Sequence, residues 1–85
     1  MQIKCKHLMD GPGPSEAIVS IVTADGQQEE VVVYTGLLRD GYLEVGPVLG
    51  NRDGETLVEL PRESASGRWR VWVPETEVVE DREVA

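Results

Sequence analysis

The sequence contains no phenylalanine, a single cysteine and no long apolar run. With Cys5 as the only thiol, a disulfide within the chain is excluded, and a lone thiol is typical of proteins from reducing compartments. No stretch approaches the roughly 20 apolar residues that a membrane-spanning helix needs. We therefore expect a cytoplasmic protein that does not act in a membrane.

Basic residues are also scarce. Eight lysines and arginines stand against 16 acidic residues, which gives a net charge of −8. This field repels phosphate backbones and anionic lipid headgroups and favours basic partners. Acidic residues gather near the C-terminus, where we expect a disordered tail over residues 80–85. The alternative is that this tail docks onto a basic partner surface.

No stretch has the apolar spacing of an amphipathic helix over three turns. Instead, five turn-forming dipeptides recur 13 to 15 residues apart: Asp10-Gly11, Asp25-Gly26, Asp40-Gly41, Asp53-Gly54 and Ser66-Gly67. Asp-Gly is a strong hairpin signal, because both residues tolerate the positive φ that tight hairpin turns require. The segments between these turns do not resemble one another, so the regular spacing does not indicate a solenoid repeat.

The turns divide the chain into short runs rich in valine, isoleucine, leucine and aromatic residues. We predict strands over residues 1–9, 17–23, 30–35, 42–46 (continuing briefly at 48–50), 56–60 and 68–73, a 3₁₀ turn at 74–77 and a last strand at 78–79. The predicted fold is all-β: a small, mostly antiparallel barrel or meander of five to six strands, which forms one domain over residues 1–79.

Alternation along these runs identifies the side chains expected to face inward. The predicted core consists of Ile3, Val19, Ile21, Val31, Val33, Leu43, Val45, Val58, Leu60, Trp69, Val71 and Val73. A chain of 85 residues can enclose only a thin core, so a deep active site is not expected.

Cys5 and His7 are the only pair that suggests catalysis or metal binding, because they share one face of a strand. Same-face neighbours lie about 7 Å apart, beyond hydrogen-bond reach, and two ligands are too few for zinc. The segment Asn51–Glu55 resembles part of a calcium loop but has leucine where two acidic ligands should stand, so it is read as a hairpin turn. We therefore predict no catalytic residue, metal, cofactor or small-molecule substrate, and expect that the protein is not an enzyme.

The segment Arg68-Trp-Arg-Val-Trp72 has the composition of a recognition surface. Alternation places Arg68, Arg70 and Trp72 on the outer face of a strand, and arginine and tryptophan are enriched at binding hot spots. Two other interpretations remain. The arginine stems could simply cover an exposed indole, or Trp72 could close the other side of the core.

The C-terminal stretch Val71-Trp-Val-Pro-Glu-Thr-Glu-Val78 has a strand, a Trp-Val-Pro sequence and a 3₁₀ turn, followed by a last short strand at Val78-Val79. This order resembles the close of a bacterial SH3-type domain. The resemblance implies an SH3-like barrel and carries the family's ligand groove over to Pro74 and Trp72. The acidic, tyrosine-rich opening motif and the tandem tryptophans of eukaryotic SH3 domains are absent, so it implies the fold and not binding of proline-rich ligands.

The sequence therefore predicts a non-enzymatic interaction module that binds a protein partner through Arg68, Arg70, Trp72 and Pro74. Self-association through the valine-rich segments 17–22 and 31–33 is the variant of this prediction. A nucleic-acid-binding barrel that uses the same arginines with Trp72, Lys4 and Lys6 is the alternative, and it must overcome the net charge of −8. A third possibility is an acidic inhibitor that mimics nucleic acid.

Overall fold

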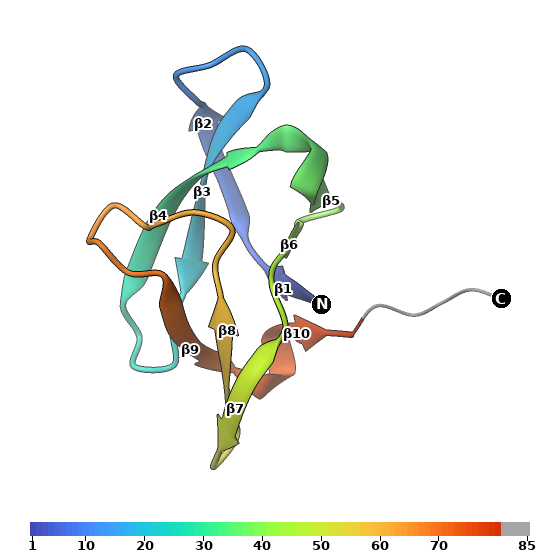
Figure 1. The fold of residues 1–85 in the computed structure, drawn as a ribbon, viewed down its shortest axis with the longest axis vertical. Helices are drawn as coiled ribbons and strands as arrows, with labels where there is room; N and C mark the ends of the chain where they lie inside the picture. Colours follow the sequence, from blue (N-terminus) through green and yellow to red (C-terminus); the bar gives the residue numbers. More distant parts are fainter. Residues whose placement is uncertain (81–85) are drawn as a thin grey trace, which may run out of the picture.

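Antiparallel strands make up most of the chain in a computed structural model that describes residues 1–80 (Figure 1). The strands are β1 (Gln2–Lys4), β2 (Lys6–Asp10), β3 (Glu16–Val22), β4 (Gln28–Tyr34), β5 (Leu38–Arg39), β6 (Tyr42–Glu44), β7 (Val48–Arg52), β8 (Glu55–Glu59), β9 (Arg70–Pro74) and β10 (Val78–Val79). Two 3₁₀ turns, η1 (Thr35–Leu37) and η2 (Glu75–Glu77), complete the fold. The predicted all-β class is confirmed. The tail predicted over residues 80–85 lies, apart from Glu80, outside the described residues.

The strands form three small sheets, with the orders β2-β3-β4, β7-β8-β9 and β10-β1-β6-β5. Tight turns close the β5-β6 and β7-β8 hairpins where the sequence predicted them, whereas longer loops join β2 to β3 and β8 to β9. Asp40 and Gly41 have φ of 53° and 83°, and Asp53 and Gly54 have φ of 34° and 80°. Positive φ at both central residues is the geometry that makes Asp-Gly favourable, because glycine lacks the Cβ that would clash.

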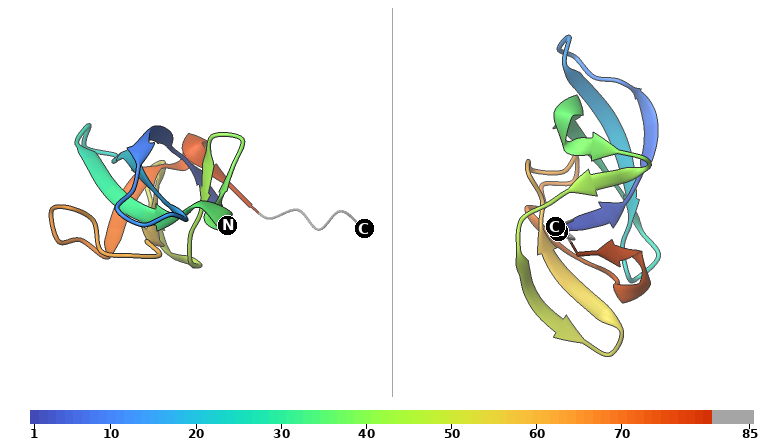
Figure 2. Two further views of the ribbon diagram at one scale, coloured as in Figure 1. Left: turned by 90° about the horizontal axis from the view of Figure 1, so that it is seen from above. Right: turned by 90° about the vertical axis from the view of Figure 1, so that its right-hand side faces the viewer.

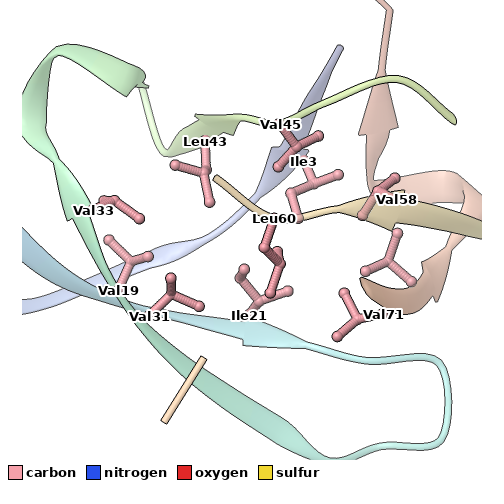
Figure 3. Packing of buried hydrophobic residues seen from close by; sticks show 11 residues of the cluster. Ile3, Val19, Ile21, Val31, Val33, Leu43, Val45, Val58, Leu60 and Val71 are labelled. Carbon is pink, nitrogen blue, oxygen red and sulfur yellow. The ribbon is translucent and has the colours of Figure 1, made fainter. Parts of the chain in front are cut away.

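The three sheets enclose one aliphatic core (Figure 3). Alternation along each strand sends every second side chain inward. All predicted core residues are buried except Trp69, whose placement in the core was wrong: it is 52% exposed. Strand β9 begins at Arg70, so the alternation used for the prediction does not extend back to Trp69. Ala17 is buried as well, although it was not predicted.

The sequence prediction also missed β5, and it gave residues 48–50 as a continuation of the strand at 42–46, whereas β6 and β7 belong to different sheets. Two more differences concern the strand over residues 1–9 and the turn after β4. The predicted strand over residues 1–9 is divided at Cys5, whose backbone N–H donates to the carbonyl of Gly41 at 2.9 Å. This break lets β1 and β2 belong to different sheets. The second difference is η1, an additional 3₁₀ turn that follows β4 as η2 follows β9.

The two halves of the described chain have the same architecture, which the sequence did not indicate. Adding 40 to the residue numbers of β1, η1 and β5 gives those of β6, η2 and β10. In each half, three longer strands form an antiparallel sheet, a 3₁₀ turn follows, and a two-residue strand ends the unit. The β2-β3 and β7-β8 hairpins extend from opposite sides of the four-stranded sheet (Figure 2, right).

Pairing between the halves follows an approximate two-fold axis. Ile3 pairs with Leu43, the residue 40 positions later, at the centre of the β1-β6 ladder. The hydrogen bond from Cys5 N–H to Gly41 has its counterpart in that from Val45 N–H to the carbonyl of Met1, also at 2.9 Å. Because strands from both halves alternate across the four-stranded sheet, neither half can complete the core alone.

Candidate binding surfaces

The predicted partner-binding residues lie on or next to one strand of the β7-β8-β9 sheet. Arg70, Trp72 and Pro74 alternate with the buried Val71 and Val73, so they occupy the outer face of β9. Arg68 precedes this strand and lines a small depression together with Trp72 and Arg52. We call Arg52, Arg68, Arg70 and Trp72 the Arg–Trp surface.

Trp72 is half-buried on this outer face. It pairs with Leu57 across the ladder, and a Cβ added at Gly50 would lie 3.6 Å from its ring. The indole therefore extends across β8 as far as Gly50 on β7. The guanidinium of Arg52 stacks on the ring at 4.0 Å from the centroid. The covering arginine is thus Arg52, which the sequence did not indicate, because it comes from a strand separated from β9 by β8.

Each arginine of this surface has a carboxylate partner. Arg52 Nε lies 2.9 Å from Glu55 Oε1, Arg70 Nε 4.0 Å from Glu59 Oε2, and Arg68 Nε 3.7 Å from Glu29 Oε2. The Arg52–Glu55 and Arg70–Glu59 pairs are exposed and contribute little to stability, and all three pairs offset the positive charge locally. The surface therefore presents guanidinium planes and one indole ring with little excess charge.

Arg68 also belongs to a buried hydrogen-bond network. The carboxylate of Glu29 is buried and accepts hydrogen bonds from Ser64 Oγ at 2.8 Å and Ser66 Oγ at 2.6 Å. The backbone N–H of Arg68 donates to Ser64 Oγ at 3.1 Å. These contacts join the loop 61–68 to β4, so part of the role of Arg68 is to hold this loop in place.

Trp69 lies beside this surface as an exposed indole between Arg68 and Arg70. Its carbonyl accepts a hydrogen bond from the backbone N–H of Leu60 at 2.8 Å, which fixes its backbone at the end of the β8-β9 ladder. Sequence reasoning assigned Trp69 to the core and so missed it as a candidate for binding.

Cys5 and His7 have different surroundings. Cys5 is half-buried against the core, and burial raises the pKa of its thiol, whereas His7 is exposed on β2. Within residues 1–80, no group of three or more His, Cys, Asp or Glu side chains is arranged to hold a metal ion. In the turn that follows β3, a hydrogen bond from Thr23 Oγ1 is the main cause of a lowered pKa at Asp25, an exposed carboxyl.

We expect Cys5 to react slowly with iodoacetamide at pH 8, because thiolate is the reactive form and burial disfavours it. Because the pKa of the Cys5 thiol is higher in the folded state, its contribution to the free energy of unfolding is fully present below the pKa of the unfolded state. This contribution is lost as the pH rises through the pKa of the folded state. Mass spectrometry of the alkylated protein, with and without urea, measures the rate. Alkylation as fast in the folded protein as in urea would contradict this expectation.

Two depressions lie beside the last strands of the three-stranded sheets, one in each half, and their linings correspond in part. One, of about 90 Å³, lies beside Trp72 and is bordered by Ala24. The other, of about 280 Å³, lies beside Val32 on β4 and is bordered by Ala65. In both cases the turn of the opposite half crosses the edge of the last strand, with hydrogen bonds from Ala24 N–H to the carbonyl of Trp72 and from Ala65 N–H to that of Glu30.

Comparison with known proteins identifies no relatives: no protein-family model, curated protein or solved structure matches this chain. The SH3-like resemblance of the C-terminal stretch therefore stays a prediction. Within the described residues 1–80, no helix has the length and apolar character needed to cross a membrane.

Proposed function

We propose that the protein is a small interaction module that binds another protein through the Arg–Trp surface and the adjoining Trp69. The observation that carries this proposal is the exposure of the Trp69 indole between two arginines whose side chains are themselves more than half exposed. Tryptophan and arginine are enriched among the few residues that dominate the binding energy at protein interfaces. The lone, half-buried thiol of Cys5 supports a reducing, cytoplasmic setting.

A protein partner suits this surface better than nucleic acid does. The carboxylates of Glu29, Glu55 and Glu59 lie against the three arginines and would be brought close to any phosphate bound there. With a net charge of −8 in addition, counterion release offers little affinity. A protein surface can instead pair with both the guanidinium groups and the neighbouring carboxylates.

Affinity capture from the source cells tests the proposal. The wild-type protein is compared with Trp69→Ala/Arg70→Ala, which changes only exposed side chains, and with the control Lys4→Ala/Lys6→Ala on other strands. We expect at least one captured protein to fall more than tenfold in the first variant and to be unchanged in the control and after nuclease treatment, as for the loss of a hot spot. Equal capture by the Trp69→Ala/Arg70→Ala variant, or capture lost on nuclease treatment, would overturn the proposal.

A further inference from the structure

The two halves differ most on the outer faces of their three-stranded sheets. In the second half, Gly50, Leu57 and Trp72 form a row across the ladders. The equivalent row in the first half consists of Met9, Ile18 and Val32. The correspondence also holds at the bulges, since each ladder shifts register immediately before Met9 or Gly50.

This difference explains the unequal depressions. In the second half the ring of Trp72 occupies the row, and the guanidinium of Arg52 covers it. In the first half, Val32 occupies the position equivalent to Trp72. Gly11 occupies the position equivalent to Arg52, because Gly11 precedes the turn that leads to Glu16 as Arg52 precedes the turn that leads to Glu55. Val32 and Gly11 are smaller than Trp72 and Arg52, and the hollow beside Val32 is the larger of the two, at about 280 Å³, with Ile18, Val31 and Val32 on its walls.

The charges around the hollow indicate which ligand it suits. Glu30 and Glu63 border it, both are exposed, and neither forms an ion pair with a described residue. Arg62 is the one cation among the described residues that border it, and it lies 3.1 Å from Glu16, which neutralises it. An apolar floor with an acidic rim favours an apolar ring that carries positive charge beside it.

We propose that the Val32 depression binds an aromatic side chain flanked by basic residues, presented by a segment of a partner protein. In the second half of the chain, the Trp72 ring and the Arg52 guanidinium form such an aromatic and cationic pair at the equivalent position. This inference rests on the proposed function as an interaction module and adds a second contact surface with a stated ligand chemistry. The ring would lie over Ile18 and Val32, and its neighbouring cations would approach Glu30 and Glu63.

Titration of the ¹⁵N-labelled protein with the peptide acetyl-Gly-Arg-Trp-Arg-Gly-amide, followed by NMR, tests the inference. We expect saturable shifts centred on Ile18, Val32 and Ala65, with a dissociation constant on the order of 1 mM or lower, as for a ligand with one buried ring. Peptides with Ala for Trp, or Glu for both Arg, should bind at least tenfold more weakly. No saturable shift at these residues, or equal binding of the control peptides, would overturn the inference.

In the variant Val32→Trp, the new indole is expected to occupy the depression in place of the peptide's ring. It should abolish the peptide shifts, whereas Gln28→Trp, at an exposed position on the same face of β4, should leave them unchanged. If Val32→Trp does not fold, the surface variant Glu30→Lys/Glu63→Lys should weaken binding at least fivefold. Unchanged binding in either pocket variant would contradict the assignment.

The two proposals fail in different ways. Loss of cellular capture on changing Trp69 and Arg70, together with an absence of peptide binding at Val32, would leave the Arg–Trp surface and remove the second site. Peptide binding at Val32, together with capture that the Trp69→Ala/Arg70→Ala variant does not reduce, would leave the second site and remove the Arg–Trp surface.

Discussion

Replacement of Ile3 or Leu43 by alanine is expected to lower the free energy of unfolding by about 2–5 kcal/mol. Both side chains are fully buried, and they pair with each other where the two halves meet. A domain of this size has a total stability of only about 4–12 kcal/mol, so either change removes a large fraction of it. Urea unfolding followed by circular dichroism measures the effect.

Val22→Ala is the matched control for this prediction. Val22 lies on a strand of the same fold but is 42% exposed, so its replacement should change the free energy of unfolding by less than about 0.5 kcal/mol. If Ile3→Ala and Leu43→Ala were as mild as the control, these residues would not form the centre of the core.

Division of the chain between Asp40 and Gly41 is expected to give two fragments that do not fold alone but fold when mixed. In the four-stranded sheet β1 lies between β6 and β10, and both of these belong to the second half. A separate first half would therefore expose the apolar side of β1 and leave its backbone groups without sheet partners. Circular dichroism of residues 1–40, of residues 41–80 and of their equimolar mixture measures this directly.

The expected complex contains one copy of each fragment, which analytical ultracentrifugation can establish. The uncut chain at the same concentration provides the reference spectrum. Independent folding of either fragment as a monomer would show that the core is not shared, and a mixture without β structure at high micromolar concentration would show that the contacts between halves are too weak to hold the fold.

The hairpin turns and most of the core were predictable because their causes are local. Asp-Gly marks a tight turn through the backbone freedom of two adjacent residues, and alternation within a strand depends only on its pleat. The same rule failed at Trp69, where the chain is not yet in a strand and its side chain is not committed to either face. Similarly, Pro74 indicated the turn η2, whereas Thr35-Gly-Leu37 carries no proline to mark η1.

The two-fold arrangement of the halves could not be predicted, because equivalent positions share their spacing along the chain and their place in the sheets but not their residue type. Ile3 and Leu43, or Val32 and Trp72, occupy equivalent positions with different side chains. The stacking of Arg52 on Trp72 was missed for a related reason: the two residues come together only when β7, β8 and β9 form one sheet. Contacts of this type require the strand order, which the hydrophobic pattern alone does not determine.

The packing of the two halves around one core positions both proposed binding surfaces. A NOESY spectrum of the ¹³C,¹⁵N-labelled protein tests this most directly. We predict contacts between the side chains of Ile3 and Leu43, and between the Trp72 indole and both Leu57 and the α-protons of Gly50. A spectrum in which Ile3 has no contact with Leu43, or in which the Trp72 indole has none with Leu57, would contradict the account.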